Sequence, residues 1–286
     1  MVIDGPEKWR LEQVQEAVKT SAEGKSRIKV VIHQNSHNLG RFKARLIGAQ
    51  LAKCSQLLFV DDRVEIEANY IEVVSKLNEK IALPSVIERD TANPIGRVNN
   101  LFRKKIFGKH IETSYPILPE NFDQLPKGTS GLWLPRDWFI SSCHHLKSQT
   151  NIDATMSDDT KLLKDLVQKH GRIYRANEAV IFYNPREGII ESIVHLFHRG
   201  PKFVDYYFKP GRRFFVWLLI FYTMVFPAII LLILKPFLAL WLLILLLLIS
   251  IWLDQNFVTF PYTALGVIFA GLSFGLGLIA GLFKKY

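Results

Sequence analysis

The sequence contains very little cysteine and no visible export signal. Its 286 residues include 2 cysteines, Cys54 and Cys143, which stand in unrelated contexts. This excludes a disulfide-stapled secreted domain and suits a reducing compartment such as the cytosol. A cleavable signal peptide is also missing, because Met1 leads at once into a short strand and a charged helix. We therefore expect residues 1–200 to remain on the side of synthesis.

Charged side chains almost disappear after residue 213. Residues 214–286 contain only four of them, Lys235, Asp254, Lys284 and Lys285. The uncharged stretches 214–234, 237–253 and 262–283 approach the roughly 20 apolar residues that an α-helix needs to cross a bilayer. The sequence therefore predicts about three transmembrane helices, of which the middle one is short.

Basic residues outnumber acidic ones, and the formal net charge is +10. No stretch interleaves basic and aromatic residues in the manner of a nucleic-acid surface, so we expect no nucleic-acid partner. An anionic membrane suits the charge better, and four basic residues before the first apolar stretch favour a cytosolic catalytic domain: Lys202, Lys209, Arg212 and Arg213. We expect an integral protein of a bacterial-type inner membrane. Three spans would place Lys284 and Lys285 on the far side, a mild conflict with the positive-inside rule.

Strands and helices alternate through the charged part of the chain. The pattern predicts strands at residues 1–4, 27–33 and 56–60, and helices over residues 9–18, 40–52 and 68–77. Such alternation indicates an α/β domain with a mostly parallel sheet, which binds ligands at the carboxyl ends of its strands. Asp61 and Asp62 follow an apolar strand at such an end. They could bind a hard cation and the phosphates it holds, or form an ordinary charged turn.

Four segments resemble, in order, motifs of family-two glycosyltransferases of the GT-A fold. They read MVIDGP at 1–6, GRFKARLIG at 40–48, VDDRVEIEANYI at 60–71, and SDDTKLLKDL at the start of 157–183. The family patterns are VVDDGS, GxxxARNxG, LDADDxxxPDYL and xEDxxLxxRL. The resemblance implies a Rossmann-like GT-A catalytic domain over residues 1–186, an amphipathic interfacial segment over 187–213 and a transmembrane region over 214–286.

One element of the family is absent from the sequence. Family members open with a strand that ends in a PxYNE-like turn, whereas this sequence begins at the element that follows. The resemblance therefore implies a GT-A domain lacking its first strand, either because the true start lies upstream or because the copy is degenerate. The second case leaves an alternative function, a catalytically inactive GT-A remnant that serves as a membrane scaffold or partner subunit.

The resemblance implies a site for a nucleotide-diphosphate sugar. Asp4 would contact the nucleobase, and Arg45 would contact the diphosphate or the fold around it. Asp61 and Asp62 occupy the first two positions of the family's D-x-D motif, which implies a site for Mg²⁺ or Mn²⁺. Arg63 stands at the third position and would itself offset phosphate charge, which weakens the need for metal. From the residues alone, Asp4 and Arg45 are equally consistent with a turn acid and a surface arginine.

Asp158 and Asp159 stand where the family carries its catalytic acid. The resemblance implies that Asp159 accepts the proton of the acceptor hydroxyl while the sugar is transferred with inversion, with Asp158 beside it. Two acids at a helix start are also good caps, because they complement the helix dipole without any catalysis.

The segment 128–138 resembles the part of the family that shapes the acceptor side. The residues assigned to this side are Gly131, Trp133, Arg136 and Trp138, with Arg199 further along the chain. Aromatic residues here are equally consistent with core packing. The segment 99–110 mixes cations with apolar residues, which suits either a helix on an anionic surface or a solvated loop.

Residues 189–197 form an apolar stripe that is typical of a helix in the membrane interface. Processive family members carry QxxRW at this point to hold a growing polymer, whereas this sequence has Ile193, Leu196 and Phe197. Only Arg199 and the glycine after it resemble the family. We therefore expect transfer of a single sugar to a membrane-proximal acceptor, for example a lipid-linked saccharide.

Glycines recur at helical spacing in the last apolar stretch. The pairs Gly271/Gly275 and Gly277/Gly281 have the small-xxx-small spacing that allows two helices to approach closely. We expect them to serve packing within the protein or in a homo-oligomer.

Overall fold

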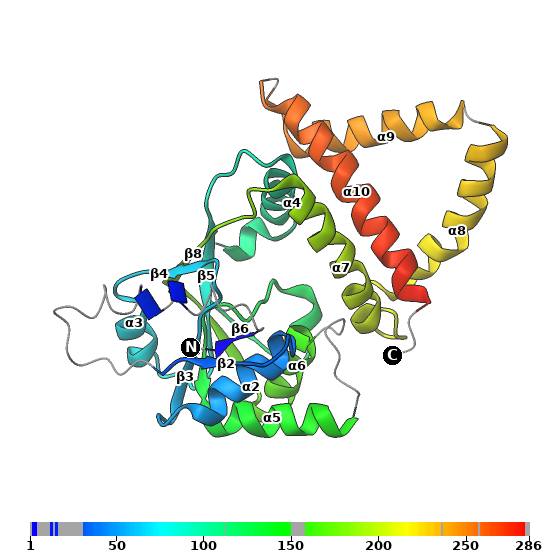
Figure 1. The fold of residues 1–286 in the computed structure, drawn as a ribbon. Helices are drawn as coiled ribbons and strands as arrows, with labels where there is room; N and C mark the ends of the chain where they lie inside the picture. The colour runs from blue at the N-terminus through cyan, green and yellow to red at the C-terminus, as the bar shows by residue number, and fades with distance from the viewer. Residues whose placement is uncertain are drawn as a thin grey trace.

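The computed structural model describes residues 2–4, 12–13, 15–16, 31–111, 113–149, 158–235, 237–256 and 258–283. An α/β domain is followed by helices that extend away from it (Figure 1). Most of the helix expected over residues 9–18 and of the strand expected over 27–33 lies outside the described residues. Lys284, Lys285 and the side chain of Asp158 also lie outside them.

A six-stranded mixed sheet forms the centre of the domain. Its strand order is β3, β7, β5, β8, β4, and β6 pairs with β8 beside this path. The pair β5–β8 is parallel, whereas the pairs β3–β7, β5–β7, β4–β8 and β6–β8 are antiparallel. The strands are β3 (Gln56–Phe59), β4 (Val64–Ile66), β5 (Ala82–Glu88), β6 (Tyr115–Ile117), β7 (Leu132–Pro135) and β8 (Ile173–Tyr183).

The parallel arrangement expected from the sequence is present in part. β3, β5 and β8 run in one direction, and β4, β6 and β7 run against them. A short connection joins β3 to β4, and a parallel crossover needs a dozen or more residues, so these two strands cannot form a parallel unit. β1 (Val2–Ile3) and β2 (His33–Gln34) are parallel to each other and form a separate two-stranded sheet.

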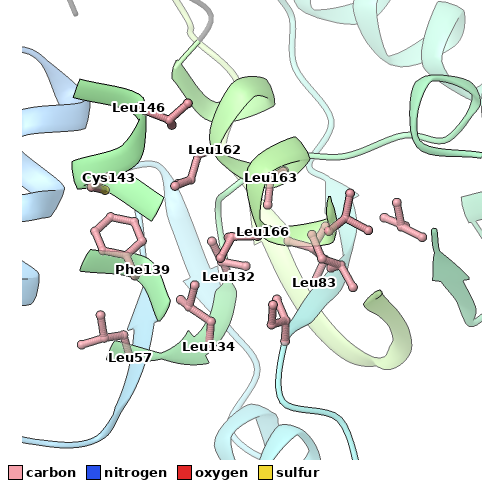
Figure 2. Packing of buried hydrophobic residues seen from close by; sticks show 14 of the residues in the cluster. Leu57, Leu83, Leu132, Leu134, Phe139, Cys143, Leu146, Leu162, Leu163 and Leu166 are labelled. Atoms are coloured by element: carbon pink, nitrogen blue, oxygen red, sulfur yellow. The ribbon is translucent and has the colours of Figure 1, made fainter. Parts of the chain in front are cut away.

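Both faces of the six-stranded sheet are covered. On β7, Leu132 and Leu134 are fully buried on one face, while Trp133 between them packs on the other face with Tyr70. This follows from the alternation of side chains along a strand. Figure 2 shows the first cluster, in which strand leucines meet Phe139 and helix leucines. The helices around the two clusters are α2 (Arg41–Leu51), α5 (Arg136–Gln149) and α6 (Asp158–His170) on the first, and α3 (Tyr70–Lys76) on the second.

Two helices connect this domain with the C-terminal helices. They are α4 (Pro94–Ile111) and α7 (Ile189–Tyr207). Tyr206 of α7 is buried in the main core, and Val204, two residues before it, packs against C-terminal helices. The tail itself consists of α8 (Phe215–Leu234), α9 (Leu238–Leu253) and α10 (Phe260–Leu282). Among the described helices, only α10 is both long and apolar enough to cross a membrane, and a third of its apolar window is buried inside the molecule.

The glycines of α10 have two different environments. A Cβ on Gly277 would lie 2.2 Å from the carbonyl oxygen of Phe197, and one on Gly281 would lie 2.8 Å from Val204. This pair therefore packs against α7 of the same chain. A Cβ on Gly271 or Gly275 would meet nothing within 4 Å. The close helix contact predicted from the spacing is present for one pair, within the protein.

Candidate active site

Arg45 joins two acids that belong to separate sequence motifs. Its Nη2 donates to Oδ1 of Asp61 at 2.6 Å, and its Nη1 donates to Oδ1 of Asp159 at 2.7 Å. Asp61 follows β3, Asp159 lies in the first turn of α6, and Arg45 lies on α2. The Arg45 side chain is only 10% exposed, so its two ion pairs are largely shielded from water. Three segments thus meet at the edge of the sheet where β3 ends.

A second arginine approaches from the same helix. Arg41 Nη2 lies 2.7 Å from Oδ2 of Asp159. Arg41 and Arg45 are one helical turn apart and so project from the same side of α2. The helix begins after Gly40, whose φ of 82° is a conformation that favours glycine. Asp159 is therefore held by two guanidinium groups.

The turn before β7 completes the contacts of this cluster. Thr129 Oγ1 accepts from Arg45 Nη1 at 2.6 Å, and Ser130 Oγ donates to Oδ2 of Asp61. Gly131 has a φ of 75°, and its N–H donates to the carbonyl of Phe59 at 2.7 Å. A Cβ at residue 131 would lie 2.6 Å from Pro84 Cγ, so the turn requires glycine there. The backbone of this turn is thereby fixed against the end of β3.

Asp61 stays ionised in this setting. Burial alone raises the pKa of a carboxyl group, because it disfavours the charged form. The charge of Arg45, the hydrogen bonds from Ser130 and Arg45, and the charge of Arg41 outweigh burial and lower the pKa of Asp61 below its usual 3.8.

Several cations surround His195 of α7. Burial and then the charges of Arg186, Arg199, Lys202 and Arg41 lower the pKa of His195 to about 3. The imidazole is therefore neutral at physiological pH, among groups that are positive. The start of α7 also lies close to the turn after β3, since Glu191 is 3.6 Å from Arg63, two residues after Asp61.

The residues at this site do not form a ligand set for Mg²⁺ or Mn²⁺. These ions prefer several oxygen ligands around one point. Asp61 has one oxygen on Arg45 and the other on Ser130, and Arg45 itself lies between Asp61 and Asp159 where a bridging cation would lie. No group of three or more His, Cys, Asp or Glu residues suited to a metal occurs in the described part of the chain. We expected from the sequence that Arg63 would offset the charge of the donor phosphates. In the structure its guanidinium group lies 3.6 Å from the Glu191 carboxylate of α7.

Comparisons with known proteins identify no family for this chain. No family model matches the sequence, and no curated protein matches it. Among solved structures, one of GalNAc-T7 with UDP, GalNAc and Mn²⁺ is 13% identical, with a TM-score of 0.41 over 71% of this chain and 43% of that one. A structure of residues 1–349 of S. aureus TarS is 10% identical, with a TM-score of 0.43 over 73% of this chain and 63% of that one. This chain thus spans less than two thirds of either, and at these TM-scores its function has to be argued from its own residues.

The remaining residues assigned to donor binding lie around the same edge. Asp4 Oδ1 accepts from the Asn35 side chain at 2.9 Å and from the Leu39 N–H at 2.8 Å, just before α2. It therefore shapes the approach to the arginines. Asp62 is exposed beside Asp61, and Asp158 is the first residue of α6.

Three residues assigned to the acceptor side make other contacts. Arg136 Nε donates to the carbonyl of Ala49 at 2.9 Å and so ties α5 to the end of α2. Trp138 stacks on His170, with ring centroids 3.5 Å apart. His170 ends α6, which places this stack ~16 Å along the helix from Asp159 at a rise of 1.5 Å per residue. Trp133 is partly buried and packs against the second cluster.

Sequence reasoning missed several residues of the site. Arg41 could have been found, because it precedes Arg45 by four residues on a predicted helix. Thr129 and Ser130 lie inside the segment 128–138, but their contacts depend on how that turn folds against β3. Arg186 and His195 gave no signal in the sequence, since their contribution comes from the position of α7.

Proposed function

We propose that this chain is a glycosyltransferase that moves one sugar from a nucleotide-diphosphate sugar to a membrane-proximal acceptor, with inversion. The observation that carries the proposal is the meeting of Arg45, Asp61 and Asp159. They come from three segments that are far apart in the sequence, and they are the residues to which the family resemblance gives donor binding and proton removal. If Asp159 were only a helix cap and Asp61 only part of a charged turn, no contact of both with the same guanidinium group would be expected.

Arg41 and Arg45 are the groups that would hold the donor diphosphate. When the bond between the sugar and the diphosphate breaks, negative charge grows on the leaving phosphate. Guanidinium groups bind phosphate oxygens with charge-assisted and often bidentate hydrogen bonds. Fixed arginines at this position would therefore stabilise the departing nucleoside diphosphate, and no step is assigned to a metal ion.

Asp159 is the group that would take the proton of the acceptor hydroxyl. The hydroxyl oxygen forms a new bond to the anomeric carbon, its proton passes to the Asp159 carboxylate, and the diphosphate leaves from the opposite face. In the structure Asp159 contacts Arg41 and Arg45. Binding of the donor diphosphate would draw these arginines away from Asp159, so that the base becomes available only when the donor is present.

The acceptor would approach from α7. The residues that replace the polymer clamp serve packing, since Leu196 is buried and the carbonyl of Ile193 accepts from Ser273 of α10. This supports transfer of one sugar rather than polymerisation. Because α7 also touches the apolar tail, an acceptor with a lipid anchor could reach the site without leaving the membrane surface.

Donor binding can be tested by thermal unfolding of the full chain in detergent with a panel of nucleotide sugars. A true donor at 100 times its dissociation constant stabilises a protein by about 2.7 kcal/mol. We expect one donor to raise the melting temperature, and the shift to persist in a metal chelator because arginines hold the diphosphate. If no nucleotide sugar shifts the transition, the proposal is wrong and the inactive scaffold becomes the better account.

Catalysis is tested with the variant Asp159→Asn. We expect it to keep the donor-induced shift and to lose transfer by roughly 10²–10⁴-fold, the usual contribution of a general base. Asp137→Asn is the matched control, since Asp137 also lies in the first turn of a helix but its side chain is 90% exposed. Equal transfer by both variants would remove Asp159 from the mechanism. The anomeric configuration of the product, read by NMR, tests inversion.

A further inference from the structure

The start and the end of the apolar tail meet in space. Tyr222 of α8 donates its hydroxyl to the carbonyl of Leu278 in α10 at 2.9 Å. Leu218, Tyr222 and Leu278 form a buried cluster with Val204 of α7. A chain that crosses a bilayer an odd number of times has these two ends on opposite sides. The contact between them is therefore incompatible with three spans.

The other end of α10 is bound to the α/β domain. Asp254, between α9 and α10, is 6% exposed at its side chain and lies 2.9 Å from Arg97 of α4. It also accepts from Thr263 of α10 at 2.6 Å. A Cβ on Gly266 would lie 2.3 Å from the carbonyl oxygen of Pro94, which shows how closely α10 approaches α4.

Between these ends, α10 runs beside α7. Ser273 contacts Ile193, Gly277 contacts Phe197, and Gly281 contacts the turn at Pro201 and Val204, so the two helices run in the same direction. Over this length α7 carries several ionisable residues: His195, His198, Arg199, Lys202 and Asp205. Charged side chains are costly in the hydrocarbon of a bilayer. α10 therefore cannot cross the membrane without carrying these groups into it.

The way α8 and α9 are joined to α10 leaves too little depth for them to cross the bilayer. At 1.5 Å per residue, α8, α9 and α10 are ~30, ~24 and ~34 Å long. With their ends in contact they form an open triangle (Figure 1). In a triangle whose sides are these three helices, the turn between α8 and α9 lies only ~20 Å from the axis of α10. The hydrocarbon core of a bilayer is ~30 Å thick.

The chemistry of the triangle fits a lipid leaflet. Most side chains of α8 and α9 are apolar and exposed, among them Trp217 at 69%, Ile233 at 74% and Trp241 at 65%. Such helices, apolar on every side, require an apolar surrounding. Arg212 and Arg213, just before α8, contact Asp123 and Gln124 of the α/β domain and lie near Lys127 and Lys164, so this corner has more cations than acids, which suits anionic headgroups. Lys235 lies at the corner between α8 and α9, and a triangle tilted in the leaflet lets its charged end extend to the headgroups.

We infer that this protein is monotopic: α8, α9 and α10 enter the leaflet that faces the α/β domain and none of them crosses the bilayer. The end of α10 then lies on the same side as the domain. This places the apolar tail beneath α7, with α4 and α7 at the level of the headgroups. The mode of attachment is independent of whether the site transfers sugar, so the two proposals can fail separately.

The test uses the full chain in the membrane of a bacterial host, with the exposed Cys54 replaced by serine. The buried Cys143 is kept, and one further cysteine at a time is introduced, either as Lys235→Cys at the α8–α9 turn or as Phe283→Cys after α10, where Phe283 is 72% exposed. Asp137→Cys on the domain is the control. We expect a membrane-impermeant maleimide to label none of the three in spheroplasts. In inverted vesicles it should label Asp137→Cys and Phe283→Cys to the same extent.

Each other arrangement gives a different result. Labelling of Lys235→Cys alone from the outside means that α8 and α9 cross as a hairpin. Labelling of both tail positions from the outside means three spans. Either result overturns the inference. Reaction of every variant after detergent solubilisation establishes that the thiols are present and that the proteins are made, so an absence of outside labelling is informative.

Discussion

Arg45 is the residue on which the site depends. Its guanidinium compensates two carboxylates that are both only about a quarter exposed, with side-chain exposures of 27% for Asp61 and 23% for Asp159. Removal of one partner of a buried ion pair leaves the other charge without compensation. The cost of losing Arg45 is therefore larger than the strength of either contact alone.

This can be measured with Arg45→Met. We expect the free energy of unfolding to fall by about 3 kcal/mol, at the low end for buried pairs because the acids keep some contact with water. Arg89→Met is the matched control, since Arg89 and Glu65 form an ion pair whose side chains are 51% and 54% exposed. Such a pair contributes less than about 1 kcal/mol. Urea unfolding in detergent gives both values, and equal losses would contradict the assigned role of Arg45.

At the scale of single residues, the sequence predicted where acids and arginines stand but not what they touch. Arg45 contacts Asp61 and Asp159 in the structure, and the donor-binding and catalytic roles assigned to these residues stay predictions. The positions of Arg136 and Trp138 could not be predicted, because adjacent residues at a strand-to-helix junction point to different neighbours. Which neighbour each one meets is decided by packing between α2, α5 and α6.

The packing of α7 on α10 is the central feature at the scale of helices. At their crossing two glycines meet, since a Cβ on Gly200 would lie 2.2 Å from the backbone of Gly277. Only residues without a side chain allow this approach. The apolar stripe of α7, predicted to lie against lipid, is therefore partly covered by α10, while Ile190 and Val194 of the stripe remain exposed.

Gly277→Ala tests this contact. The added methyl group has no room beside the Phe197 carbonyl, and forced overpacking costs typically about 1–3 kcal/mol, so we expect a loss of this size. Gly275→Ala is the control on the same helix, because a Cβ there meets nothing within 4 Å. Both changes raise helix propensity equally. Thermal unfolding should therefore separate them, and similar melting temperatures would mean that α7 and α10 do not pack so closely.

The helices and strands with strong periodicity were well predicted. The strand expected over 56–60 is β3, and the helix expected over 68–77 is α3, shorter by a few residues at its ends. The directions of β4, β6 and β7 were not predicted, because strand direction depends on the connections and on the partner, which no local pattern encodes.

At the scale of the whole molecule, the α/β domain and the tail are joined by a buried charge. Arg97 on α4 reaches Asp254 in the loop between α9 and α10, and the hydroxyls of Thr259 and Thr263 also donate to that carboxylate. The sequence showed Asp254 only as an interruption between two apolar stretches. The length and composition of a stretch can predict a transmembrane helix, but they cannot reveal that Asp254 binds to the α/β domain.

Arg97→Met should loosen this junction. Without Arg97, the buried Asp254 carboxylate has no compensating positive charge, and we expect docking of the loop to weaken by about 2–3 kcal/mol. Limited proteolysis in the loop after α9 should then become faster. The double variant Arg97→Met with Asp254→Asn removes the uncompensated charge and should regain most of the protection. If the single variant resists protease as well as the parent does, the domain and the tail are held together by other contacts.

The four groups that contact one another at the acid site are balanced in charge. Arg41 and Arg45 carry two positive charges, and Asp61 and Asp159 carry two negative ones, so the quartet presents little field to a distant anion. Long-range steering of a charged ligand depends on net charge at the approach. That charge comes from Arg186, Arg199 and Lys202 around α7. In the proposed function, the groups that attract the donor from a distance, and make its capture depend on salt, are thus separate from the groups that would bind its diphosphate.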